Sequence, residues 1–340
     1  MEFVFLLLVA AAGGFFGACV GGNFSFVITG FAGLAATAAG VAGGSDVSSF
    51  LFSYVAFGPF TGPHIAFTGA VAGSAYAAMK GYTDNGKDIA QPLARLGKPD
   101  VLLVAAAFGV GGWLFKTYVI DPIPWFGGHT DGVALTVAIS AIVVRFAFAD
   151  RSLLNPENYN KTGNKFSPHE HSVWIRYQET GPQLLTMGIF PGLLGASVAL
   201  LLAVNFPGVG MSAAAFPWAI SAITIFFLNI GYNSPVTHHM TIIGGLGAIV
   251  FYPILAGQHV ISAATLHGLQ VDTPLGVDYG LAVGAILIGT AFATLSSFLG
   301  EASARLFQSR GKTHIDPPAV AIFLATTLIW IVAGLMGASN

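Results

Sequence analysis

Ten long apolar segments, separated by short polar stretches, dominate this sequence. A helix that crosses a lipid bilayer needs roughly 20 predominantly apolar residues, and each of these segments reaches or approaches that length. The segments of the first half are Phe3–Val20, Phe24–Val41, His64–Met79, Val101–Val119 and His129–Phe148. Those of the second half are Leu184–Val204, Ala213–Ile230, Pro235–Leu255, Tyr279–Leu299 and Ala319–Met336. The pattern predicts an all-α integral membrane protein with about ten transmembrane helices.

The composition favours a fold immersed in lipid. Of the 340 residues, 54% are hydrophobic and 8% are charged, whereas a soluble domain carries about 25% charged residues. The 44 glycines suit close packing between membrane helices, and glycine-rich helix faces are compatible with a homodimer or homotrimer. A net charge of −2 argues against the clustered basic surface that nucleic acids require. We therefore expect membrane lipids, and no nucleic acid, as partners.

The basic residues predict the orientation of the chain. If ten spans alternate in direction, all but one of the 13 Lys and Arg residues fall on the same side, and Lys116 is the exception. Because Lys and Arg are enriched in cytoplasmic loops, we predict a multi-pass protein of the cell membrane with both termini outside. Residues 150–180 then form a cytoplasmic linker between a first transmembrane repeat, 1–149, and a second, 181–340.

Three sets of matching residues indicate that the two halves arose by duplication. Residues 14–20 match residues 192–198 at a shift of 178, and His129-Thr130-Asp131 matches His314-Ile315-Asp316 at a shift of 185. Since five spans per half reverse the direction in which the second half enters the membrane, we predict that the two five-helix repeats are inverted. At a shift of 176, identical residues occupy these pairs of positions: Pro59 and Pro235, Thr61 and Thr237, Gly69 and Gly245, Ala72 and Ala248, and Tyr76 and Tyr252.

A polar, proline-containing junction interrupts the apolar sequence in each half, at residues 58–64 and 234–239. Proline breaks a continuous helix, and transporters with inverted repeats often bind their substrate at broken helices. Residues 48–57 are too few to span the membrane and predict a re-entrant or half helix. The alternative is that each proline begins an ordinary helix after a loop. The substrate path is predicted to be lined by Pro59, Thr61, His64, Ser234, Pro235, Thr237, His238 and His239.

Four ionisable residues begin the fifth and tenth spans: His129, Asp131, His314 and Asp316. Ionisable residues within membrane segments are costly to bury, so they mark functional sites by default, and these four are assigned to proton or ion coupling. The alternative is structural, because a carboxylate in the first turn of a helix complements the helix dipole.

Enzymatic motifs are missing from the sequence. It contains no HExxH, GxSxG or P-loop pattern, and His169-Glu170-His171 offers too few ligands for a metal site. We therefore expect no enzymatic activity, no cofactor and no bound metal. The alternatives are an intramembrane metal-dependent enzyme, with His238, His239 and either His64 or Asp316 as ligands, and a non-transporting membrane scaffold.

Residues 62–73, Gly-Pro-His-Ile-Ala-Phe-Thr-Gly-Ala-Val-Ala-Gly, followed by Gly86-Lys87-Asp88-Ile89, resemble a family of prokaryotic multi-pass membrane proteins found in actinobacteria and haloarchaea. The resemblance implies a multi-pass fold and no particular activity. The predicted topology, with a short re-entrant piece before the third span, is also similar to that of urea transporters. Because the proline-rich slot motif of the urea channel is not matched here, this likeness does not imply urea as the solute.

Taken together, these patterns predict a membrane transporter or channel for a small polar solute or ion. Its path is expected to lie between the two inverted repeats.

Overall fold

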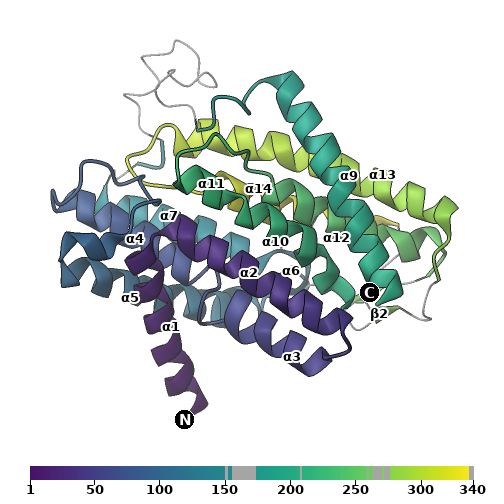
Figure 1. The fold of residues 1–340 in the computed structure, drawn as a ribbon, viewed down its shortest axis with the longest axis horizontal. Coiled ribbons are helices and arrows are strands. Elements are labelled where there is room, and N and C mark those ends of the chain that lie inside the picture. The colour runs from purple at the N-terminus through teal and green to yellow at the C-terminus, as the bar shows by residue number, and fades with distance from the viewer. Residues whose placement is uncertain are drawn as a thin grey trace.

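The computed structural model describes residues 1–149, 152–154, 174–206, 209–258, 260–262, 270–271 and 276–336. Figure 1 shows a bundle of helices in which α1, α4 and α5 gather on the left and α9, α12 and α13 on the right. Helices α2 and α10, one from each half, lie side by side between these two groups.

Most of the first half of the chain is helical. Between α4 and α5 lies a 3-10 turn, Leu93–Leu96. Two helices continue as π-helical turns: α3 as Leu51–Ala56 and α5 as Lys116–Ile120. The helices are α1 (Glu2–Val20), α2 (Gly22–Val41), α3 (Ser45–Phe50), α4 (Ala66–Met79), α5 (Pro99–Phe115), α6 (Phe126–His129) and α7 (Gly132–Phe148).

The second half repeats this helical character. A 3-10 turn, Gly210–Ala214, precedes α10, and a π-helical turn, Ala304–Gln308, follows α13. Two short antiparallel strands, β1 (Val260–Ser262) and β2 (Gln270–Val271), lie between α12 and α13. The helices are α9 (Gly181–Asn205), α10 (Ala215–Ile223), α11 (Ile225–Asn229), α12 (His238–Leu255), α13 (Tyr279–Ser303) and α14 (Pro317–Leu335).

Each of the ten predicted spans coincides with helical structure, and the helical fold class is confirmed. Within the described residues, eight helical segments are long and apolar enough to cross a membrane. The third and fifth predicted spans are shorter, because α4 has 14 residues and α7 has 17. Among the described residues, the strand pair β1–β2 is the one departure from the predicted all-α fold, and no sequence pattern predicted it. Of the predicted half helix at 48–57, residues 48–56 lie in α3 and the π-helical turn, which pack against α2.

The outer surface of the bundle carries large apolar side chains. Phe3 and Leu8 on α1, Phe190 and Leu194 on α9, and Leu287 on α13 are all exposed. Exposed apolar area of this extent marks a surface that is covered in the native setting. On helices of membrane-spanning length, the covering medium is lipid.

The same packing arrangement occurs in both halves. Helices α1, α4 and α5 pack against one another, as do α9, α12 and α13, while α2 packs against α10 and α7 against α14. The closest approaches are at glycines. A Cβ atom added to Gly69 would lie 2.6 Å from the carbonyl oxygen of Gly14, and one added to Gly244 would lie 2.6 Å from that of Gly192. No side chain can replace these glycines without moving a helix.

These glycine contacts can be compared with the shifts found in the sequence. Gly14 and Gly192 match at a shift of 178, and their packing partners, Gly69 and Gly244, are separated by 175 residues. The proline motif suggested a shift of 176, which would pair Gly69 with Gly245.

Candidate functional site

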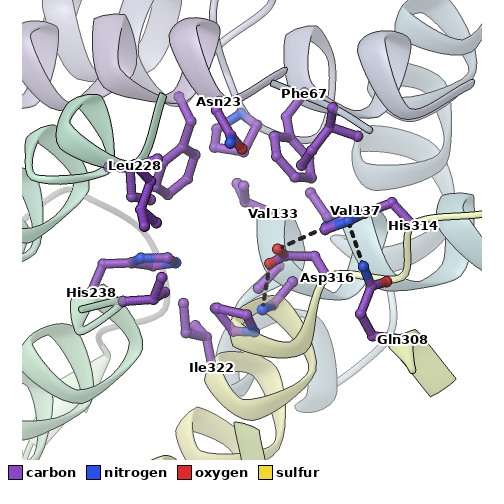
Figure 2. A pocket seen from close by; sticks show the side chains of 18 of the residues that line it. Asn23, Phe67, Val133, Val137, Leu228, His238, Gln308, His314, Asp316 and Ile322 are labelled. Atoms are coloured by element: carbon purple, nitrogen blue, oxygen red, sulfur yellow. Dashed lines mark hydrogen bonds and ion pairs between the residues drawn. The ribbon is translucent and has the colours of Figure 1, made fainter. Parts of the chain in front are cut away.

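A cavity of about 280 Å³ lies between the two halves of the chain. Helices α2, α4 and α7 line it from the first half, and α10, α11, α12 and α14 line it from the second. Figure 2 shows the side chains around it, with Asp316 and His238 among those that point into the cavity.

Equivalent residues of α7 and α14 form two walls of this cavity. They come from the N-terminal cap and first turns of each helix and match at the shift of 185 found in the sequence. From α7 these are Asp131, Val133, Ala134 and Val137, and from α14 they are Asp316, Pro318, Ala319 and Ile322.

Helices α7 and α14 run antiparallel. Near the start of α7, the hydroxyl of Thr327 donates to that of Thr130 at 2.8 Å, and near its end the Arg145 Nε donates to the Thr313 hydroxyl at 3.2 Å. With a rise of about 1.5 Å per residue, this pairing separates the two cap carboxylates by roughly 15 Å along the helices. The cavity is therefore elongated, with one carboxylate towards each end.

A polar network surrounds Asp316. His314 Nε2 lies 3.3 Å from Asp316 Oδ1, and His314 Nδ1 lies 3.0 Å from Gln308 Nε2. Because Gln308 Oε1 accepts the backbone N–H of Ile315 at 2.8 Å, the Gln308 amide nitrogen faces the imidazole and donates to it. This assignment of the hydrogen bonds places the proton of neutral His314 on Nε2, which donates to Asp316. Figure 2 shows the contacts of His314 with Asp316 and with Gln308 as dashed lines.

The surroundings of Asp316, which precedes the span Pro317–Leu335, keep it ionised. Burial raises the pKa of this carboxyl group, but the hydrogen bond from His314, the electrostatic interaction with the His314 and His238 side chains and the N–H of Ala319 together lower it by more. The net result is a pKa below the ordinary value, so Asp316 carries a negative charge at neutral pH.

Lys87 approaches the same end of the cavity from the loop between α4 and α5. Its Nζ donates to the backbone carbonyl of Gln308 at 3.1 Å. Burial, followed by the charge of Arg145, lowers the pKa of Lys87. The neighbouring Asp88 also lines the cavity, and its carboxylate accepts the backbone N–H of Ala90 at 3.1 Å.

Aromatic rings cover another part of the wall. Phe26 lies at the centre of this group, with its ring centroid 5.4 Å from that of Trp218, 6.1 Å from that of Phe67 and 4.8 Å from that of His238. Phe67 in turn meets His314 edge to face at 5.7 Å. The rings therefore connect the two histidines that flank Asp316.

His238 is buried with an unsatisfied nitrogen. The residue is 4% exposed, and its Nδ1 has no hydrogen-bond partner. An unpaired buried polar atom is costly, so a ligand in the cavity that hydrogen-bonds this ring would remove the cost.

A family model matches this chain twice, over residues 1–171 and residues 154–339. The chain belongs to that family, a family of unknown function designated DUF7973. Each half of the chain matches the DUF7973 model separately. No curated protein and no solved structure matches the chain, so the likeness to urea transporters stays an expectation from the sequence.

Four of the predicted site residues line the cavity: Asp131, His238, His314 and Asp316. In both halves, the cap aspartate that begins the last helix faces the cavity. Of the residues predicted for the substrate path, only His238 lines the cavity. Those outside are Pro59, Thr61, His64, Ser234, Pro235, Thr237 and His239, together with His129 from the coupling set.

Two of these outlying residues have structural contacts. The Thr61 hydroxyl donates to the carbonyl of Val55 at 2.6 Å, which holds the junction against the π-helical turn. The ring of His129 stacks on Trp125 with centroids 4.7 Å apart and meets Trp330 edge to face at 5.2 Å. His129 therefore packs between aromatic rings, whereas its sequence equivalent, His314, faces the cavity.

Sequence reasoning did not assign Lys87, Asp88 or Gln308 to the site. Lys87 and Asp88 stood out only as part of the family resemblance, and Gln308 lies 221 residues from Lys87. One sequence without homologues gives no signal for a contact over that separation.

No metal centre emerges from the part of the chain that the structure describes. In this part, no three His, Cys, Asp or Glu side chains form a group that could hold a metal ion. The His169-Glu170-His171 fragment lies outside the described residues.

Proposed function

We propose that this protein is a membrane transporter or channel, and that a small polar solute or ion passes through the cavity between its two halves. The observation that carries the proposal is the set of equivalent residues from α7 and α14 that line one cavity between the two halves. A solute path that lies between two repeats is expected to be lined by equivalent residues of both.

We further propose that the two halves are inverted repeats. Three observations support this: the family model matches each half separately, α7 and α14 run antiparallel, and the same helices pack together in each half. Helices α2 and α10, and likewise α7 and α14, would then be the equivalent pairs that meet across a two-fold axis.

The proposed orientation places one end of the cavity towards the cytoplasm. Lys87, Trp174 and Gln308 line this end, and all three belong to segments that the distribution of basic residues assigns to the cytoplasmic side. Towards the opposite side, His129 packs between Trp125 and Trp330. This arrangement suits a cavity loaded from the cytoplasm, with release requiring either rocking of one half against the other or opening of a gate at those rings.

Flux through purified protein tests the proposal. Sealed proteoliposomes that contain a pH-sensitive dye would be challenged with gradients of urea, ammonium, formate, bicarbonate, amino acids and monovalent cations. Ala134→Phe would place a phenyl ring in the cavity and obstruct it, and Val143→Phe, on the exposed face of the same helix, is the matched control. We expect protein-dependent flux of one solute that Ala134→Phe abolishes and Val143→Phe preserves.

Because a neutral, uncoupled solute leaves the internal pH unchanged, uptake of labelled urea and amino acids would be measured in parallel. If neither the dye assay nor the uptake assay detects flux, the transport proposal is contradicted and the alternative of a non-transporting membrane scaffold is favoured. Flux that Ala134→Phe does not reduce would contradict the assignment of the path to this cavity.

A further inference from the structure

Carboxyl groups outnumber basic side chains among the described residues that line the cavity. Asp88, Asp131 and Asp316 line it, against a single cation in the lining, Lys87. The Lys87 ammonium is turned to the carbonyl of Gln308. His238 and His314 are the remaining titratable groups of the lining.

An anion is disfavoured at the start of α7 and of α14. The N-terminus of a helix ordinarily attracts anions through its free backbone N–H groups. Here the Asp131 carboxylate accepts the N–H of Ala134 at 2.8 Å, and that of Asp316 accepts the N–H of Ala319 at 2.9 Å. An anionic solute would therefore meet a carboxylate at each of these helix starts.

The surroundings of Asp316 suit an amine cation better than a bare metal ion. Alkali and alkaline-earth cations require a shell of oxygen ligands, whereas Phe26, Phe67 and Trp218 present rings. The face of an aromatic ring attracts an ammonium group and tolerates alkyl substituents. The unpaired Nδ1 of His238 can accept a hydrogen bond from an N–H of such a cation.

We infer that the cavity binds a small monovalent amine cation, such as ammonium or methylammonium, between Asp316, His238 and the ring of Phe26. This inference rests on the proposed function, since it names the solute class of the same cavity. Asp316 supplies the charge, His238 accepts a hydrogen bond, and Phe26 excludes water from the alkyl groups.

Binding of radiolabelled methylammonium to the purified full-length protein in detergent tests the site separately from transport. Ammonium is expected to compete, whereas formate, urea and potassium are expected not to. Asp316→Asn should raise the Kd for methylammonium at least tenfold. Asp278→Asn is the matched control, because Asp278 also caps a helix, α13, through hydrogen bonds to Gly280 and Leu281 but does not line the cavity.

Phe26→Leu keeps the site apolar and provides a second test in case Asp316→Asn does not fold. It should also weaken methylammonium binding, by about three- to tenfold, while the protein keeps its elution volume on gel filtration. Unchanged methylammonium affinity in both variants would overturn the inference, as would competition by formate or urea.

The outcomes separate the two proposals. Methylammonium binding without methylammonium flux would support the site and contradict transport. Flux of urea or formate without methylammonium binding would support transport and overturn the amine-cation assignment.

Discussion

Asp131 and Asp316 each accept the backbone N–H of the residue three positions further on, at 2.8 and 2.9 Å, and both line the same cavity. They begin antiparallel helices in different halves of the chain. Capping aspartates usually lie at the surface, where water solvates the carboxylate. At these two positions, the residue that starts a helix also supplies a carboxyl group to the cavity between the two halves, so the coupling and capping interpretations of these aspartates are compatible.

Removal of the cap at Asp316 should destabilise the protein in a pH-dependent way. Asp316→Ala is expected to lower the free energy of unfolding by about 1 kcal/mol at pH 7, the usual effect of losing an N-cap. Because folding lowers the pKa of Asp316, its contribution is present above the ordinary carboxyl pKa of about 4 and is lost as the pH falls through the lower folded-state value. Thermal unfolding in detergent, followed by circular dichroism from pH 7 down to pH 3, measures this difference.

The control for this experiment is Asp46→Ala. Asp46 lies in the first turn of α3, is exposed and makes no capping hydrogen bond, so its removal should change stability by less than about 0.5 kcal/mol. A wild-type advantage over Asp316→Ala that grows as the pH falls would contradict the sign of the pKa shift.

His238 and His239 should differ in function although they are adjacent. Both are buried with an unpaired Nδ1, but only His238 lines the cavity. His238→Gln is expected to reduce flux of the identified solute at least tenfold, whereas His239→Gln should leave it within about twofold, provided that both proteins fold. Flux into proteoliposomes, normalised to the amount of folded protein, measures the contrast. Equal loss in both variants would indicate that the pair acts through packing.

The glycine contacts predict which helix positions cannot accept a side chain. Gly69→Val would force α4 away from the backbone of Gly14, and we expect a loss of about 3 kcal/mol or more, at the upper end of overpacking costs. Gly111→Ala is the control, because a Cβ there meets no atom within 4 Å. Unfolding midpoints in detergent measure both. A Gly69→Val protein as stable as wild type would refute the close packing of α4 on α1.

Arg145 should be essential to the contact between the two halves. This residue of α7 is fully buried, and its guanidinium donates to the carbonyls of Leu153, Phe307 and Thr313. Arg145→Gln leaves buried carbonyls without donors, each at a cost of about 1–3 kcal/mol, so we expect a total loss of about 3 kcal/mol. The exposed Arg95 offers a control, since Arg95→Gln should change the unfolding midpoint little. A small effect of Arg145→Gln would show that these carbonyls find other donors.

The sequence was sufficient to predict the helices and insufficient to place most of the site. Hydropathy depends on local composition, so all ten predicted spans coincide with helices. Among the path residues predicted from the proline junctions, only His238 lines the cavity. Thr61 and its neighbours are instead held by backbone contacts within the junction. Their depth depends on how α3 and the π-helical turn pack, which no local pattern specifies. Asp131 and Asp316 were found because they recur, and Lys87 was missed because no equivalent residue occurs in the other half.

The orientation of the second repeat can be decided by labelling. Lys98 precedes α5 and Tyr279 is the first residue of α13, at corresponding helix starts in the two halves, and both are exposed. In a Cys19→Ser background, inverted repeats place Lys98→Cys in the cytoplasm and Tyr279→Cys outside. A membrane-impermeant maleimide should therefore label Tyr279→Cys in intact cells and Lys98→Cys only after permeabilisation. Repeats of the same orientation would give equal labelling of the two variants, and the cavity could not then lie on a two-fold axis in the membrane plane.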